Sequence, residues 1–247
     1  IMSFNNENEF ELAFIQALQQ HGWEAGVIAY PSEADLLANW ANILFENNRE
    51  TDRLNNQPLT AGEMAQIIEQ INVLKTPFKL NGFINGKTVV IKRDNPADTL
   101  HLGKEISLKV YDRLEIAAGK SRYQIGRQPR FSTHNAILPQ RRGDIMLLIN
   151  GMPVFHIELK KSGVPLSEAS NQIEKYLRNG VFSNLFALVQ LFVVATPEEA
   201  LYFANSSGAD GKLNPRDFFH GGDLDNEPVH HWPAVAPRSP SLPMPPP

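Results

Sequence analysis

The sequence contains no cysteine among its 247 residues. A disulfide framework and a thiolate metal site are therefore excluded, so a metal ion could be held only by oxygen or imidazole ligands. The sequence also lacks a run of about 18 consecutive apolar residues, the length that a membrane helix needs. Its first residues, "IMSFNNENEF", do not show the basic and then apolar pattern of a secretory signal. These absences predict a cytoplasmic protein that does not bind a membrane.

The chain has no large excess of charge of either sign, because its net charge is −4. A surface that binds nucleic acid all over is therefore not expected. Residues 120–142 differ from the rest, since they carry basic residues and no acidic one. This segment either contacts DNA phosphates or is an ordinary solvated surface of strands and loops. Its arginines are Arg122, Arg127, Arg130, Arg141 and Arg142.

The order of hydrophobic patterns predicts an α/β fold with a mixed sheet flanked by helices. Helical spacing and capping signals indicate helices over residues 8–24, 31–50, 60–71 and 165–180, with Thr60 and Glu63 at capping-box spacing. Strand-like patterns cover residues 78–94, 105–131, 141–161, 188–196 and 200–206. Residues 1–214 are expected to form the folded domain, and residues 215–247 a Pro-rich linker or tail.

A phosphate-binding loop is not predicted, although "GFINGKT" at residues 82–88 is similar to one. That loop needs four residues between its glycines, whereas Gly82 and Gly86 enclose three, and the sequence that follows is typical of a strand. The Asn-Gly pair instead predicts a β-hairpin turn within residues 78–94. No ATP site is therefore expected in this chain.

The segment "RRGDIMLLINGMPVFHIELKKSG" at residues 141–163 predicts a β-hairpin that turns at Asn150-Gly151. The length of the turn decides which side chains share a face of the paired strands. A two-residue turn would place Asp144 opposite Ile157 and away from Glu158. A three-residue turn, with Gly151 in the left-handed conformation, would place Asp144 opposite His156 and diagonal to Glu158. We favour the three-residue turn.

In that register three charged residues share one face of the hairpin: Asp144, Glu158 and Lys160. The apolar residues Ile145, Leu147, Phe155, Ile157 and Leu159 take the other face, toward the core. Two adjacent carboxylates suit a single hard cation such as Mg²⁺, which activates water for phosphodiester hydrolysis, while an ammonium group can orient that water or offset developing charge. The alternative is that these charges face solvent on a half-exposed strand.

The segment "GDIMLLINGMPVFHIELKK" resembles the PD-(D/E)xK nuclease core, with Gly143 where the signature has proline. Together with "LNGFINGKTVVIKRDNP" and "NQIEKYLRNGVFSNLFALVQLFVV", it resembles more closely the N-terminal endonuclease domain of the R (HsdR) subunit of type I restriction-modification enzymes. The resemblance covers about residues 7–206, and the nuclease core within it about residues 105–206.

The resemblance implies Asp144 and Glu158 as Mg²⁺ ligands and Lys160 as the catalytic lysine. It also implies that Glu11, on the first helix, supplies a further acid near the metal, although Glu7 and Glu9 lie close to it in the sequence.

Two further residues match the Q-x-x-x-Y motif of these nucleases, Gln172 and Tyr176. Their spacing places both on one helix face, from which an amide and a phenol could reach the DNA backbone. The alternative is that Tyr176 packs as part of the core.

The function that the resemblance implies is that of a Mg²⁺-dependent endonuclease acting on double-stranded DNA. Sequence recognition would belong to the partner methyltransferase (M) and specificity (S) subunits. ATP-driven translocation would belong to motor domains outside these 247 residues. The alternatives are a repair or junction nuclease on the same core, or a catalytically inert DNA-binding module.

Overall fold

The computed structural model describes residues 4, 6–86, 88–110, 121–133, 140–205 and 218–221. The helices are α1 (Glu7–Gln20), α2 (Glu33–Asn48), α3 (Ala61–Val73), α4 (Pro77–Ile84), α6 (Leu166–Arg178) and the 3₁₀ helix η1 (Asn184–Leu188). The strands are β1 (Val27–Ala29), β2 (Thr88–Lys92), β3 (Glu105–Lys109), β4 (Tyr123–Arg127), β5 (Arg130–Ser132), β6 (Gln140–Arg142), β7 (Ile145–Ile149), β8 (Met152–Leu159), β9 (Leu191–Ala195), β10 (Ala200–Ala204) and β11 (Phe218–Gly221).

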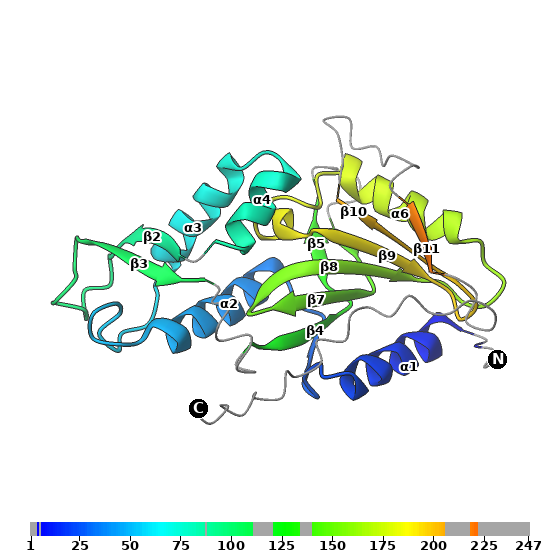
Figure 1. Cartoon of the computed structure of the whole chain (residues 1–247), viewed down its shortest axis with the longest axis horizontal. Coiled ribbons are helices and arrows are strands. Elements are labelled where there is room, and N and C mark those ends of the chain that lie inside the picture. The colour runs from blue at the N-terminus through cyan, green and yellow to red at the C-terminus, as the bar shows by residue number, and fades with distance from the viewer. Residues whose placement is uncertain are drawn as a thin grey trace, which may run out of the picture.

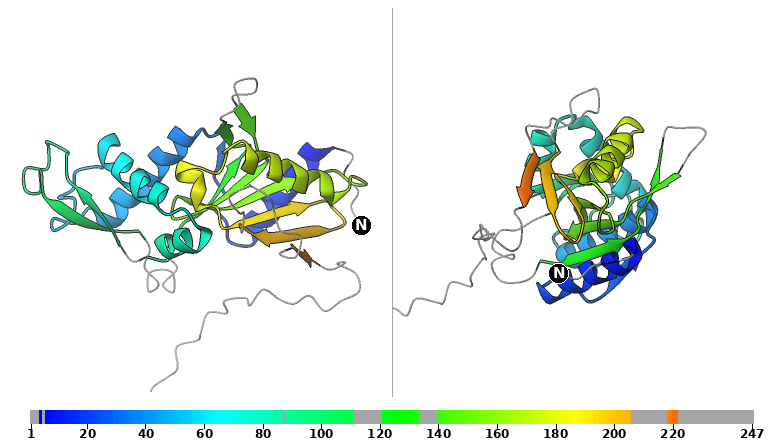
Figure 2. Two further views of the ribbon diagram at one scale, coloured as in Figure 1. Left: turned by 90° about the horizontal axis from the view of Figure 1, so that it is seen from above. Right: turned by 90° about the vertical axis from the view of Figure 1, so that its right-hand side faces the viewer.

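The centre of the fold is a seven-stranded mixed sheet with the order β1-β4-β7-β8-β9-β10-β11 (Figure 1). The pairs β1–β4 and β8–β9 are parallel, and the other neighbouring strands are antiparallel. Helices α1 and α6 lie on opposite sides of this sheet (Figures 1 and 2). Two short antiparallel pairs, β2–β3 and β5–β6, complete the described strands. The predicted fold class is therefore confirmed.

Local signals in the sequence fix where α2 and α3 begin and where α1 ends. The predicted capping box at Thr60 and Glu63 is present at the start of α3, and Ser32 caps α2 in the same way with Asp35. Helix α1 is followed by Gly22, whose φ of 96° is the left-handed conformation that a glycine adopts without a steric penalty. The capping boxes satisfy amide groups at the helix starts, and the turn at Gly22 satisfies carbonyl groups at the end of α1.

The apolar residues form one cluster on each face of the sheet. On the α1 side, Phe10 and Ile15 pack against the inward side chains of β4, β7 and β8. On the other side a larger cluster joins α2, α3, α4, α6 and η1 to the sheet and to the β2–β3 pair. None of the helices in the described ranges is long and apolar enough to cross a bilayer.

The hairpin predicted within residues 78–94 is wrong, because its first half is the helix α4. The Thr76 side chain accepts a hydrogen bond from the amide of Lys79, and Pro77 occupies the first turn, where its fixed φ favours a helix. The Asn-Gly pair follows this helix instead of turning a hairpin, and β2 pairs with β3, more than ten residues further along.

The last described strand, β11, pairs with β10 and lies beyond the predicted domain boundary at residue 214. Residues 222–247, most of the predicted tail, lie outside the described residues, as does the strand-like stretch 111–120. The division into a domain and a tail stays a prediction.

Candidate active site

The predicted hairpin is present as β7 and β8, but its turn has two residues and not three. Asn150 and Gly151 both have positive φ, 51° and 83°, and Ile149 pairs with Met152. Further along the pair the register shifts, because Leu147 pairs with Phe155 whereas Leu148 pairs with Pro153. Strand β8 therefore contains one extra residue, a β-bulge, next to a proline that cannot donate a ladder hydrogen bond.

Because of this bulge, Asp144 and Glu158 lie on the same face of the hairpin, as was expected from a three-residue turn. Ile145 pairs with Ile157, so the residues one step further out, Asp144 and Glu158, lie on neighbouring strands and on the same side. The expected pairing of Asp144 with His156 is wrong, since His156 pairs with Met146. The predicted apolar face is confirmed, because it forms the cluster beneath α1.

The two carboxyl groups of Asp144 and Glu158 lie in a site that is largely shielded from water. The pKa of Asp144 is raised to about 7, mainly by burial and second by the negative charge of the neighbouring Glu158. A hydrogen bond that Asp144 Oδ2 accepts from the Leu159 amide at 2.7 Å opposes this shift. Glu158 is fully buried, and burial raises its pKa to about 8. Without a compensating cation such a pair retains protons near neutral pH.

Gln172 and Tyr176, on α6, lie beside Glu158, where Tyr176 is buried and Gln172 is half-buried. The Gln172 amide donates to Glu158 Oε2 at 2.6 Å and to the Tyr176 hydroxyl at 2.7 Å. That hydroxyl donates in turn to the carbonyl oxygen of Arg142 at 2.7 Å, and the Tyr176 ring is only 4% exposed. The alternative that Tyr176 packs as core is therefore confirmed, and contact of this pair with DNA stays a prediction.

Lys160 directly follows β8, and its ammonium lies 3.6 Å from the carboxylate of Glu7 on α1. Glu11, one turn further along α1, is instead bound by Arg127 and by the side-chain amide of Gln128 at 3.0 Å. The structure thus brings Glu7, and not Glu11, to the lysine. In the described part of the chain, no three His, Cys, Asp or Glu side chains gather as a metal site.

The five arginines assigned to DNA divide into two groups. Arg122 forms a bidentate pair with Glu24 at 2.8 and 3.0 Å, and Arg127 is paired with Glu11. Arg130 donates to the carbonyl oxygen of Tyr30 and lies 3.8 Å from Asp35. These three side chains therefore already have acceptors within the protein. The other two, Arg141 and Arg142, lie at the site.

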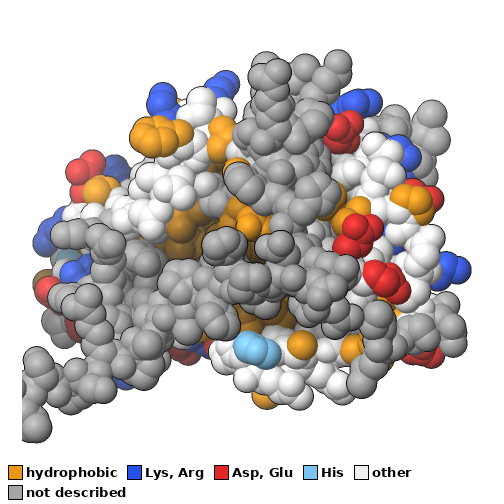
Figure 3. All heavy atoms as spheres, turned by 45° about the vertical axis from the view of Figure 1, so that its right-hand side comes forward, with side chains coloured by type: hydrophobic (Ala, Val, Ile, Leu, Met, Phe, Trp, Pro, Cys, Tyr) orange, Lys and Arg blue, Asp and Glu red, His pale blue; other side chains and the backbone are white. Residues whose placement is uncertain are grey.

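A polar hollow of about 600 Å³ lies next to the carboxylates. Asp144 and Glu158 do not line it, but Lys160 and Gln172, which donates to Glu158, do. Its lining includes four cationic side chains, Arg141, Arg142, Lys160 and Lys175, but only one acidic side chain, Glu168. On the side of the molecule shown in Figure 3, by contrast, Lys and Arg lie interspersed with Asp and Glu. The hollow is thus a local concentration of positive charge on a weakly acidic protein, which suits a polyanion.

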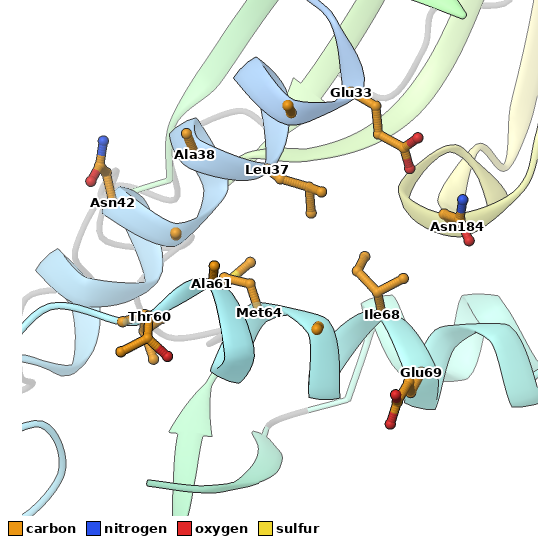
Figure 4. Close-up of a pocket in the computed structure, with 14 residues that line it drawn as sticks. Glu33, Leu37, Ala38, Asn42, Thr60, Ala61, Met64, Ile68, Glu69 and Asn184 are labelled. Carbon is orange, nitrogen blue, oxygen red and sulfur yellow. The ribbon is translucent and has the colours of Figure 1, made fainter. Parts of the chain in front are cut away.

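A second hollow, of about 730 Å³, lies between α2 and α3, where Leu37 points toward Met64 and Ile68 (Figure 4). Its lining is mainly apolar and includes no lysine, arginine or histidine. It therefore lacks the cationic groups that would hold a phosphodiester, and the polar hollow is the candidate active site.

Three residues at this site were missed or given no role from the sequence: Gly143, His156 and Lys175. Glu7 was named only as an acid close to Glu11. The imidazole Nε2 of His156 lies 2.7 Å from Glu158 Oε1. Because His156 stands two residues before Glu158, the period of a strand places both on one face, and this signal was available. Lys175 and Glu7 lie on helices, so their approach depends on how those helices dock against the sheet.

Comparison with known proteins identifies the family. The sequence model of the family described as "Type I restriction enzyme R protein N terminus" matches residues 4–211. The chain belongs to this family. The resemblance given by the β7–β8 motif and its neighbours is therefore confirmed.

Curated relatives agree with this assignment. The SsaAORF53P endonuclease subunit of Staphylococcus saprophyticus is 30% identical over 93% of this chain, and the SauCOLORF180P endonuclease subunit of Staphylococcus aureus is 28% identical over the same share. The EcoprrI endonuclease subunit of Escherichia coli is 30% identical over 84% of the chain. The matched region covers 22% of the length of each staphylococcal relative and 61% of the E. coli one.

Proposed function

We propose that this R-protein N-terminal domain is a Mg²⁺-dependent endonuclease that hydrolyses phosphodiester bonds of double-stranded DNA. The observation that carries the proposal is the meeting of Asp144 and Glu158 on adjacent strands, with Lys160 beside them, at a basic hollow. In the intact enzyme, cleavage would follow ATP-driven translocation by parts of the subunit outside these residues. Methyltransferase and specificity subunits would supply sequence recognition. The family assignment and the names of the curated relatives support this proposal.

The donor set fits a hard divalent cation. Asp144 and Glu158 offer carboxylate oxygens, and Mg²⁺ in nucleotide-processing sites uses one or two carboxylates, with water and phosphate oxygens completing its shell. Burial raises the pKa of both carboxyl groups. A bound cation is therefore needed to keep both groups ionised at neutral pH. When bound, such a metal polarises the phosphodiester and lowers the pKa of an attacking water.

The chain's own residues supply positioning and charge. The Glu7 carboxylate, 3.6 Å from the Lys160 ammonium, holds that group beside the carboxylates, where it can orient water or offset charge on the phosphate. Gln172 fixes one oxygen of Glu158 and is itself fixed through Tyr176 to the β6 backbone. Arg141 and Lys175 would hold the DNA backbone in the hollow.

The test is a set of single substitutions placed in an otherwise complete restriction enzyme. Lys160→Ala should lower DNA cleavage about 100-fold or more, because it removes a group that acts mainly in the transition state. ATP hydrolysis and translocation should continue. Lys161→Ala is the matched control, since Lys161 is exposed and, unlike Lys160, does not line the hollow.

Asp144→Ala and Glu158→Ala should abolish cleavage in the same way, and excess Mg²⁺ should partly restore activity to a single carboxylate variant but not to Lys160→Ala. Cleavage at the parental rate by Lys160→Ala would reject the assignment of this site. Structure-specific cleavage by the domain alone would favour a repair nuclease. DNA binding that is retained with no Mg²⁺-dependent cleavage would favour an inert binding module.

A further inference from the structure

Glu158 is held from two sides, and the sequence motif accounts for only one of them. Gln172 donates to Oε2 at 2.6 Å, while the imidazole Nε2 of His156 lies 2.7 Å from Oε1. Both His156 and Glu158 are fully buried, so water does not replace either partner. Each carboxylate oxygen has two lone pairs, and one on each oxygen stays available to a metal ion.

The surroundings of His156 decide which of its nitrogens carries the hydrogen. An ionised Glu158 can only accept, so Nε2 must donate to Oε1. Among the described residues, Nδ1 of His156 has no hydrogen-bond partner. A buried N–H group without an acceptor would be costly, so Nδ1 carries a lone pair and not a hydrogen. Aromatic rings of Phe131, Tyr176, Phe182 and Phe192 surround the imidazole, with centroid separations of 5.3 to 6.3 Å. When a bound cation keeps Glu158 ionised, the imidazole therefore donates through Nε2 alone.

Gly143 provides the space in which this imidazole lies. A Cβ built on Gly143 would overlap Cε1 of His156, and it would lie 3.0 Å from Cε2 of Phe131 and 3.2 Å from Oε1 of Glu158. Any larger residue would therefore push the imidazole out of line with the carboxylate. A proline at this position, as in the motif that the chain resembles, is incompatible with His156 in its present place.

We propose that His156 is a positioning residue that fixes Oε1 of Glu158 opposite Gln172, and that Gly143 is required because its missing side chain gives the imidazole room. This inference rests on the proposed function of Glu158 as a metal ligand. It also explains why glycine stands at position 143 where the motif has proline: the glycine makes room for the contact between His156 and Glu158. His156 does not touch DNA or reacting atoms in this proposal, and it acts only through Glu158.

The test compares two amides at position 156 that differ in reach. In His156→Gln the amide nitrogen can reach the position of Nε2, whereas in His156→Asn it ends near Nδ1, short of Glu158. Titration with Mg²⁺ alone, followed by calorimetry, should show affinity about tenfold or more weaker for His156→Asn but near the parental value for His156→Gln, as for other groups that orient metal ligands. Melting temperatures in EDTA should be similar for the two variants. Equal Mg²⁺ affinity of the two variants would overturn the inference.

A second comparison tests the space argument by a double-mutant cycle. Gly143→Ala should lower the melting temperature and the Mg²⁺ affinity of the parental chain. The same change should have a much smaller effect on the melting temperature in a His156→Ala background, where the added methyl finds room. Additive effects on the melting temperature would overturn the requirement for glycine. A parental chain that neither binds Mg²⁺ nor cleaves DNA would instead reject the proposed function, and the inference with it.

Discussion

At the scale of single residues, the carboxyl pair makes a prediction about stability and pH. The pKa of Asp144 is raised to about 7 and that of Glu158 to about 8, whereas in an unfolded chain both lie near 4. Between those values the folded protein retains protons that the unfolded chain has released, so the free energy of unfolding falls as pH rises through this window. The melting temperature in EDTA should therefore be lower at pH 8 than at pH 5, beyond what other groups contribute.

The matched control is the double variant Asp144→Asn, Glu158→Gln, which cannot ionise at either position. Its melting temperature should depend less on pH than that of the parent. Mg²⁺ should raise the melting temperature of the parent most at pH 8, where binding needs the fewest protons displaced. A parental pH dependence identical to that of the double variant would contradict the burial of two carboxyl groups without a cation between them.

At the scale of elements, the β7–β8 turn is fixed by its contact with α2. Gly151 has a φ of 83°, and an added Cβ would lie 2.9 Å from Cα of Trp40 and 3.1 Å from Cδ1 of Ile43. Gly151→Ala should cost about 1–2 kcal/mol in backbone strain, with about 1–3 kcal/mol more from overpacking. Gly163→Ala is the control, since Gly163 has a φ of 78° but no atom within 4 Å of the added Cβ.

Urea unfolding of the two variants measures this difference. Equal losses of stability would show that the turn does not pack tightly on α2. A larger loss for Gly151→Ala would show that the turn, and with it the register of Asp144 and Glu158, depends on that packing. Near the melting temperature of the protein, Gly151→Ala should also lose more cleavage activity than Gly163→Ala.

The same hairpin shows what the sequence could and could not predict. The period of two in a strand predicted the apolar face of Ile145 and Leu147, although Met146 and Leu148 between them are buried as well. The shared face of Asp144 and Glu158 was reached through a three-residue turn that is absent, and the bulge gives the same face instead. The bulge was missed, although Pro153 within a central strand was a signal for it. Helix α4 was missed because the Asn-Gly pair outweighed Pro77 and the i, i+4 spacing of buried Leu80 and Ile84.

The hydrogen bond from Gln172 to Glu158 lay beyond a sequence argument. It depends on the angle at which α6 docks against the sheet, and no local pattern sets that angle. The approach of Glu7 to Lys160 depends in the same way on the docking of α1.

At the scale of the whole molecule, a net charge of −4 opposes DNA binding except where positive charge is concentrated. The five arginines are close in sequence, but the fold separates them. Arg122 is paired with Glu24, whereas Arg141 lines the hollow and its Nε has no hydrogen-bond partner among the described residues. Affinity for DNA should therefore depend on the hollow and not on the segment 120–142 as a whole.

This expectation can be measured as the slope of the logarithm of DNA affinity against the logarithm of salt concentration. Arg141→Ala and Lys175→Ala should each reduce that slope by about 1 and weaken binding uniformly across sequences, because each removes one phosphate contact. Arg122→Ala should change the slope little, because its guanidinium already pairs with Glu24 and its loss leaves the charge of the hollow unchanged. Equal slopes for Arg122→Ala and Arg141→Ala would indicate that DNA follows the arginine-rich segment, and the basic hollow would then not be where the backbone binds.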